Sequence, residues 1–426
     1  MTALEGTPSV RRLTAWDPAE LESRASEYGT PLYVLDLDRI SENAQRLASA
    51  FPDAEILYAV KANALKDVLE TLHGEGIGLE CASAGELTRA LDASDDGAAV
   101  HYTAVNPPAH DLDQVVEAWE AYPELTITAG SEDTIDRLAD RGYDGRLCLR
   151  VNPGIGAGHH EKVQTGAAAK FGVPAERAVD VLADAAERSF DVVGIHAHVG
   201  SGVSSDQLDA HREFVSRMGE IARSVTEAVG DLEFVDVGGG FGVPYREDEQ
   251  PLDLEAVANA TREALGDVNA QLTIEPGRYL VADAGVLLTE INTVKAARDT
   301  TVVGVDAGMT TLLRPAMYDA YHPIRNLTAA READSSDAER GREQIPQTIA
   351  GPICESGDVF ATDRTLPASE RGDVIAIGNA GAYGYEMANQ YNSRPRPASV
   401  VTEDGTVRLA RRRETIDDVT RVERER

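Results

Sequence analysis

The sequence predicts an α/β fold, with a (β/α)8 barrel followed by a C-terminal all-β domain. Eight short β-rich runs alternate with stretches of helical spacing, and this alternation stops near residue 285. Beyond that point, strand-like runs follow one another with only loops between them. Strands that alternate with helices form parallel sheets, and eight such units over roughly 230 residues fit a barrel. A doubly wound open sheet is the alternative.

The eight expected barrel strands are short and rich in apolar and β-branched residues. In chain order they are 55–61, 77–82, 98–103, 125–129, 147–152, 192–199, 233–238 and 272–276. The stretches between them have helical spacing, and in 175–188 one face carries Ala178, Val181, Leu182 and Ala185. We therefore expect the barrel domain to cover residues 31–285.

The two ends of the chain are expected outside the barrel. Residues 286–426 contain strand-like runs without a long helical stretch between them, which predicts a β domain of the barrel or sandwich type. Residues 1–30 form a leader that can pack on this domain. The run PLYVLDLD at 31–38 is a strand signal, which we assign to the start of the barrel domain.

Acidic residues greatly outnumber basic ones. The chain has 73 Asp and Glu against 40 Lys and Arg, a net charge of −33, and only five of the basic residues are lysines. Such a surface repels phosphate, so nucleic acid is not an expected partner. Scattered acids with arginine in place of lysine favour a solvated surface adapted to high salt, as in halophiles. The alternative is a protein that binds a cationic partner.

Apolar runs and cysteines are sparse. No run of about 18 apolar residues occurs, and the N-terminus lacks the apolar core of a signal peptide, so we expect a cytoplasmic protein with no membrane partner. The cysteines are Cys81, Cys148 and Cys354, without a CxxC pair. We therefore expect neither a disulfide framework nor a metal site.

Distinctive side chains fall at the carboxyl ends of the expected strands, where barrels place their active sites. Lys61 ends the first strand, His198 ends the sixth, and Glu275 and Arg278 follow the eighth. The glycines Gly238–Gly240 follow the seventh, and the N–H groups of a glycine loop can approach a phosphate. A lysine, a phosphate loop, a histidine ring and a carboxylate together describe a site for pyridoxal 5′-phosphate (PLP).

Short motifs recur in order along the chain. They are YAVKAN at 58–63, HVGS at 198–201, GGGFG at 238–242, EPGRY at 275–279, LLRPAMYDAYH at 312–322, CESGD at 354–358 and AGAYG at 380–384. This series resembles the PLP-dependent decarboxylases of the alanine-racemase fold, also called group IV. The order and spacing of the motifs are similar to those of the diaminopimelate decarboxylase family, over essentially the whole chain.

The resemblance implies a carboxy-lyase that converts meso-2,6-diaminopimelate into L-lysine and CO2, the last step of lysine biosynthesis. Its implied catalytic residues are Lys61, which would bind PLP covalently, and Cys354, which would return a proton after CO2 leaves. Glu275 would pair with the pyridine nitrogen, and His198 would stack on the ring. The other implied cofactor residues are Ser201, Gly238, Gly239, Gly240, Gly277, Arg278 and Tyr383.

The resemblance also implies that both ends of the substrate are bound. The implied substrate residues are Arg278, Arg314, Tyr318, Glu355 and Tyr383. Arginine suits a distal carboxylate through its planar fork of donors, and Glu355 would pair with the distal ammonium. The family resemblance further implies a homodimer with shared active sites, in which Cys354 comes from the partner subunit.

Two other functions remain open at this stage. Ornithine and arginine decarboxylases share the PLP lysine and the cysteine, but they usually have aspartate after that cysteine and act on substrates without a distal carboxylate. Glu355, with Arg278 and Arg314, favours a substrate that is charged at both ends. A non-catalytic relative that acts as a regulator would typically lack Lys61 or Cys354, and both are present.

Overall fold

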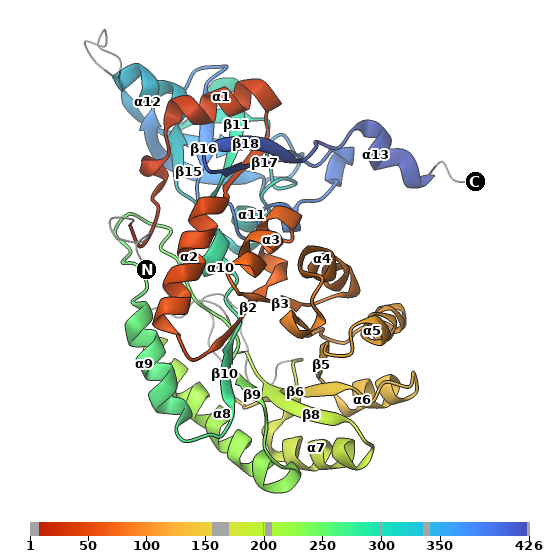
Figure 1. The fold of residues 1–426 in the computed structure, drawn as a ribbon. Coiled ribbons are helices and arrows are strands. Elements are labelled where there is room, and N and C mark those ends of the chain that lie inside the picture. The colour runs from red at the N-terminus through yellow and green to blue at the C-terminus, as the bar shows by residue number, and fades with distance from the viewer. Residues whose placement is uncertain are drawn as a thin grey trace. The chain divides into compact units, whose positions relative to one another are not determined.

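The structure, a computed structural model, contains a closed barrel of eight parallel strands. It describes residues 8–155, 170–198, 200, 207–298, 300–334 and 341–423. The barrel strands, shown in Figure 1, are β2 (Glu55–Ala59), β3 (Gly78–Cys81), β4 (Val100–Tyr102), β5 (Thr126–Ala129), β6 (Arg146–Asn152), β8 (Asp191–His196), β9 (Phe234–Asp236) and β10 (Gln271–Ile274).

Two strand pairings close the barrel. In one, β10 pairs in parallel with β2, with Ile274 opposite Ile56. In the other, β5 pairs in parallel with β6, with Ile127 opposite Leu147. A doubly wound sheet would leave two open edges, so these pairings confirm the barrel and exclude the alternative. The short strand β7 (Val173–Pro174) adds to the end of β6.

Helices alternate with the strands and surround them (Figure 1). Ala178, Val181, Leu182 and Ala185 are buried in α7, as the helical spacing predicted. Among the helices the chain forms through this region are α2 (Leu37–Ala50), α3 (Lys66–Gly74), α4 (Ala84–Ser94), α5 (Ala109–Ala121), α6 (Glu132–Ala139), α7 (Ala178–Glu187), α8 (Leu208–Val229), α9 (Leu254–Leu265) and α10 (Arg278–Val281).

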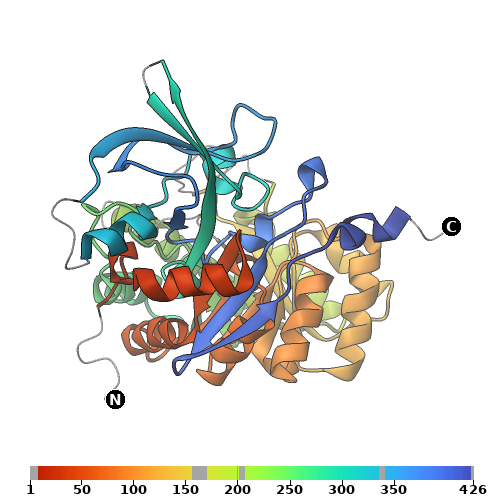
Figure 2. The same ribbon diagram turned by 90° about the horizontal axis from the view of Figure 1, so that it is seen from above.

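A second unit is built on a mixed sheet around the long strand β11, the extended green ribbon of Figure 2. Its strands are β1 (Leu32–Asp36), β11 (Gly285–Ala297), β12 (Thr300–Val305), β13 (Ile324–Asn326), β14 (Gln344–Ala350), β15 (Val359–Pro367), β16 (Val374–Ile377), β17 (Ala398–Glu403) and β18 (Thr406–Arg411). Short helices accompany them: α1 (Pro18–Tyr28), α11 (Arg314–Tyr318), α12 (Leu327–Asp334) and α13 (Ile416–Thr420).

The two faces of this sheet bury separate apolar clusters. Successive residues of β11 alternate between them, because side chains along a strand point to opposite faces. Val286 and Leu288 pack with Trp16 and Leu21 of the leader, whereas Leu287 packs on the other face. The leader thus contributes to the core of the second unit.

The chain divides differently from the expected boundaries at its N-terminal side. The run 31–38 was assigned to the barrel domain, but β1 pairs antiparallel with β11 and parallel with β17. The described residues 8–40, 243–251 and 281–423 belong to the second unit, and 41–242 and 252–280 to the barrel, apart from undescribed positions. Strand character is local in the sequence, whereas the choice of sheet depends on pairing partners far along the chain.

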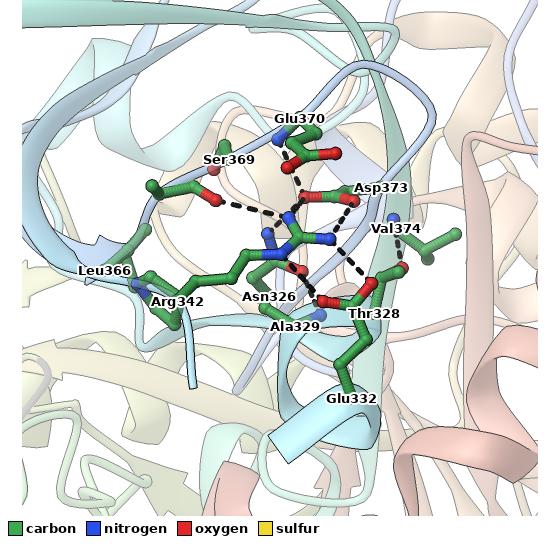
Figure 3. A network of polar contacts seen from close by, with 12 residues as sticks. Asn326, Thr328, Ala329, Glu332, Arg342, Leu366, Ser369, Glu370, Asp373 and Val374 are labelled. Carbon is green, nitrogen blue, oxygen red and sulfur yellow. Dashed lines mark hydrogen bonds and ion pairs between the residues drawn. The ribbon is translucent and has the colours of Figure 1, made fainter. Parts of the chain in front are cut away.

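A polar network ties together four segments of the second unit (Figure 3). The buried carboxylate of Asp373 accepts hydrogen bonds from Asn326 at 2.8 Å, from the Glu370 backbone N–H at 2.9 Å and from Arg342 at 2.5 Å. Arg342 also donates to Glu332 of α12. These contacts satisfy a buried charge and link α12 to the strands β13 and β16.

No described helix is both long enough and apolar enough to cross a membrane.

Candidate active site

Lys61 lies directly after β2, in the turn Val60–Ala62, and its amine contacts a buried carboxyl group. The Lys61 Nζ atom is 2.8 Å from Oε2 of Glu80, which β3 places inside the barrel. Burial raises the pKa of Glu80, and the charge of Lys61 opposes that rise. Glu80 can therefore hold the lysine amine in position and exchange a proton with it.

Glu275 follows β10 at the same end of the barrel and is paired with His196. Only 5% of Glu275 is exposed, and its Oε2 lies 3.2 Å from Nε2 of His196. Its other oxygen, Oε1, is buried and has no hydrogen-bond partner among the described residues. Burial favours a raised pKa, but the facing His196, with Lys61 and His198, outweighs it and holds the pKa of Glu275 below its ordinary value.

Asp236, at the end of β9, completes a buried cluster with Glu275 and His196. One ligand atom from each of the three lies within 4.8 Å of the others. The Gly238 N–H donates to Asp236 Oδ1 at 2.7 Å. Burial, followed by the charge of Glu275, raises the pKa of Asp236 well above its ordinary value. The pKa of Asp236 is thus raised and that of Glu275 lowered, so Glu275 is the stronger acid of the pair and the one that carries the negative charge.

The glycine loop after β9 has room only for glycine at two positions. A Cβ atom on Gly239 would lie 2.1 Å from the carbonyl oxygen of Glu275, and one on Gly238 would lie 2.6 Å from Nδ1 of His198. Gly238 and Gly240 also have left-handed φ angles, 70° and 103°. The Gly239 N–H donates to His198 Nδ1 at 3.0 Å, and burial lowers the pKa of His198 to about 3.

These features fit PLP. The glycine loop has no side chains that would block a close approach to its backbone, and His198 supplies an uncharged ring. Glu275 has a buried oxygen without a hydrogen-bond partner among the described residues, which suits a protonated pyridine nitrogen. Lys61 supplies the amine. Of the other predicted cofactor residues, Gly277 is buried and Arg278 begins α10, while Ser201 lies outside the described residues.

The predicted substrate arginine lies in the second unit, within LLRPAMYDAYH. Arg314 and Tyr318 are the first and last residues of α11, one helical turn apart, so they lie on one face. Arg314 is buried, and Tyr318 is partly exposed. Tyr383 follows β16 in a left-handed conformation with a φ of 55°.

Cys354 and Glu355 are exposed in the loop between β14 and β15. The Asn392 amide nitrogen donates to Cys354 Sγ at 3.3 Å, and the Tyr391 hydroxyl donates to Glu355 Oε1 at 2.5 Å. The loop is shaped by the Asp358 carboxylate, which accepts hydrogen bonds from two backbone N–H groups. A thiol held at the surface in this way can deliver a proton to a ligand.

The structure therefore groups the predicted residues into two sets, each within its own unit. The barrel set contains Lys61, His198, Gly238, Gly239, Gly240, Glu275, Gly277 and Arg278. The second set contains Arg314, Tyr318, Cys354, Glu355 and Tyr383.

Comparison with known proteins places both sets in one family. The sequence model of the pyridoxal-dependent decarboxylases, pyridoxal binding domain, matches residues 37–282. A diaminopimelate decarboxylase from Methanothermobacter thermautotrophicus is 42% identical over 417 residues, which cover 95% of this chain and 94% of that protein. The chain belongs to the diaminopimelate decarboxylase family.

Solved structures of diaminopimelate decarboxylases share the fold over nearly the full length. The crystal structure of the Helicobacter pylori enzyme complexed with L-lysine has a TM-score of 0.86 and 33% identity, over 95% of this chain and 99% of that one. The M. jannaschii enzyme in complex with L-lysine has a TM-score of 0.83 and 32% identity, over 95% and 94%. Membership of this PLP-dependent family confirms the expected cofactor and enzyme class.

Three residues of the barrel site were not predicted from the sequence: Glu80, His196 and Asp236. Each lies in a strand whose neighbouring residues are mostly apolar. A carboxyl group in such a strand is costly to bury without a partner. An acidic residue within an apolar strand therefore indicates a paired or functional group, and this pattern could have identified Glu80 and Asp236. His196 is two residues before His198, so the strand expected at 192–199 would have placed the two side chains on the same face.

Proposed function

We propose that the chain decarboxylates meso-2,6-diaminopimelate to L-lysine and CO2 with PLP as cofactor, the last step of lysine biosynthesis. The observation that carries the proposal is the buried, ionised Glu275, which has one oxygen without a partner at the barrel end that holds Lys61. A carboxylate in this state keeps a pyridine nitrogen protonated. When bound, PLP supplies the electron sink for the electron pair left as CO2 departs.

The barrel residues would bind and orient the cofactor. Lys61 would hold it through its amine, and Glu80 would take up or return the proton of that amine. The uncharged ring of His198 would stack on the cofactor, and Glu275 would pair with the ring nitrogen. The phosphate is assigned to Ser201, the Gly238–Gly240 backbone and Tyr383, and Gly277 and Arg278 are assigned to the cofactor without a more specific role.

The second unit would bind the far end of the substrate and complete the reaction. Arg314 and Tyr318, with Arg278 and Tyr383, are assigned to the carboxylate that remains in the product. Glu355 is assigned to the distal ammonium. Cys354 donates its thiol proton to the carbon that has lost CO2, a transfer that an exposed thiol on a loop can make.

Product analysis in high salt tests this function. The purified protein with PLP is incubated separately with meso-diaminopimelate, L-ornithine and L-arginine, and CO2 and the amine product are identified. We expect L-lysine, from diaminopimelate alone. Putrescine or agmatine would overturn the substrate assignment while keeping the decarboxylase class, and the absence of product from all three would favour a regulator.

We further propose a homodimer in which Cys354 and Glu355 complete the site of the partner subunit. Their exposure on one loop supports this, because residues presented at the surface can be supplied to another chain. Mixing inactive Lys61→Ala and Cys354→Ala proteins should restore about a quarter of the wild-type activity, since half the dimers are hybrids with one intact site each. No recovery despite demonstrated subunit exchange would show that each site is built within one chain.

The compartment and the salt response are also proposals. A proton donor such as Cys354 has to remain a reduced thiol, which favours the cytoplasm. The net charge of −33 favours a surface adapted to high salt, because salt screens the repulsion between like charges. The melting temperature should therefore rise between low and molar salt, and a flat response would argue for a cationic partner instead.

A further inference from the structure

We propose that His322, together with Tyr245, positions the guanidinium of Arg314 for the carboxylate that remains in the product. This inference deepens the proposed function and rests on its assignment of Arg314 to that carboxylate. His322 and Tyr245 are positioning residues, because they would act on the substrate only through Arg314. All three belong to the second unit.

Two side chains contact the same nitrogen of Arg314. Nη1 donates to the Tyr245 hydroxyl at 2.8 Å and lies 3.2 Å from Nε2 of His322. Arg314 is 5% exposed and His322 is 1% exposed, so both contacts are shielded from water. Two acceptors on one nitrogen fix the plane of the guanidinium, and a fixed plane is what bidentate binding of a carboxylate requires.

The hydrogen-bond geometry determines the protonation state of His322. Its Nδ1 lies 2.9 Å from the carbonyl oxygen of Gly378, which can only accept, so Nδ1 carries the hydrogen. Nε2 faces an N–H group of Arg314, so it has to offer a lone pair. His322 is therefore a neutral imidazole that accepts from the arginine. If His322 were an imidazolium, its Nε2–H would face the N–H of Arg314, and the two positive charges would lie next to each other.

The aromatic ring of Tyr245 adds a third constraint. The guanidinium carbon of Arg314 lies 5.2 Å from the ring centre, within the range of a cation–π contact. The same ring meets the imidazole of His322 edge to face, with centroids 5.3 Å apart and an interplanar angle of 87°. Tyr245 and the neutral His322 are both uncharged, so these contacts orient the guanidinium without neutralising it.

His322 also connects α11 to the sheet. The helix α11 has five residues, too few to be stable alone, so its orientation depends on tertiary contacts. Gly378 follows the last residue of β16, and its N–H donates to the Pro323 carbonyl at 2.9 Å. The backbone carbonyl of His322 accepts from Arg364 at 3.1 Å. The imidazole of His322 thus connects Arg314 to Gly378 at the end of β16 and fixes the position of the guanidinium.

Further positive charge lies beside this group. The guanidinium carbons of Arg246 and Arg364 each lie 4.1 Å from the ring centre of Tyr321, the residue before His322. Glu249 forms an ion pair with Arg246 at 3.9 Å, and Arg246, Arg314 and Arg364 outnumber this carboxylate around Tyr321 and His322. A carboxylate is the ligand chemistry that this surrounding suits.

Inhibition by two amines separates the role of the carboxylate from the rest of the site. L-lysine and cadaverine, which is L-lysine without its carboxylate, are measured as inhibitors of the holoenzyme in wild type and variants. His322→Leu should raise the inhibition constant of L-lysine about tenfold, and Tyr245→Phe about threefold. KM for diaminopimelate should rise in parallel with kcat little changed, and the inhibition constant of cadaverine should stay within about twofold.

Three comparisons make the result decisive. His322→Gln, which retains an acceptor, should recover most of the loss seen in His322→Leu. Arg314→Met should raise the L-lysine constant about a hundredfold, and adding His322→Leu to it should cause little further change. Tyr245→Phe removes only a hydroxyl, so it provides the test if His322→Leu fails to fold.

The outcomes distinguish this inference from the proposed function. If Arg314→Met weakens L-lysine binding while His322→Leu and Tyr245→Phe do not, the positioning role is overturned and the substrate role of Arg314 stands. If Arg314→Met leaves L-lysine binding unchanged, the assignment of Arg314 in the proposed function fails. Equal losses for L-lysine and cadaverine in His322→Leu would indicate general distortion and overturn the inference.

Discussion

The barrel unit and the second unit hold their candidate site residues in different surroundings. In the barrel, Glu275 and Glu80 are buried and each is paired with a basic side chain. In the second unit, Cys354 and Glu355 are exposed on a loop. Burial and a paired charge shift the pKa of a buried carboxyl group and fix its position, which suits a tightly held cofactor. Exposed groups can instead be supplied to a site on another surface. The following predictions test this division.

The largest effect is expected for Lys61→Ala, which removes the amine at the centre of the barrel set. The variant should lose the visible absorbance of the protein-linked cofactor and lower kcat by on the order of a thousandfold or more. Lys66→Ala, on the exposed side of α3, is the matched control and should retain both signals. Turnover by the Lys61 variant would overturn the assignment.

Cys354→Ala should separate the two sets of residues. The barrel set is unchanged, so the variant should keep the absorbance of the bound cofactor. Loss of the proton donor should lower the rate of L-lysine formation by about a hundredfold to ten-thousandfold. The buried Cys148 provides a control, since Cys148→Ala should affect stability more than the rate constant. A Cys354→Ala enzyme with wild-type turnover would remove this residue from the mechanism.

The second unit also contains a buried charge, in the network of Figure 3, and it should behave like the buried charges of the barrel. Asp373→Ala leaves Arg342 and Asn326 without their shared acceptor, so the free energy of unfolding should fall by about 3–5 kcal/mol. Glu332→Ala removes the half-exposed partner of the same arginine and should cost less than about 1 kcal/mol. Urea denaturation measures both, and similar losses would contradict the role of burial.

The smallest effect concerns acid stability of the barrel. Burial lowers the pKa of His211 to about 4, against about 6.5 for a solvated histidine. Below pH 6.5 the histidine in the unfolded chain binds a proton that the folded barrel does not bind. The free energy of unfolding therefore has its full value above this pH and falls as the pH drops toward 4. The slope is at most about 1.4 kcal/mol per pH unit for each such histidine.

His211→Gln should therefore flatten this part of the profile of stability against pH by about one proton, because glutamine can still reach the Thr261 hydroxyl that His211 contacts at 2.7 Å. An unaltered slope in His211→Gln would show that the histidine is not the group that takes up the proton.

Several features followed from the sequence alone. The eight barrel strands were predicted because strand and helix periods are local, and the family because its motifs are short and ordered along the chain. Strands β13 and β15 were not predicted; β13 has only three residues, and β15 carries a central run of polar residues. The assignment of 31–38 to the barrel failed because β1 finds its partners more than 200 residues away.

The sequence determined which side chains are available, and the tertiary structure decided their chemical state. Residue identity gives a lysine, a glutamate or a histidine, but a pKa depends on burial and on the charges that folding brings within a few ångströms. Thus Glu80 and His196, distant in sequence from Lys61 and Glu275, became their partners only in the closed barrel. Likewise, the motif at 312–322 gave only the identity of His322. The contact of its Nδ1 with the Gly378 carbonyl oxygen makes it a neutral hydrogen-bond acceptor for Arg314.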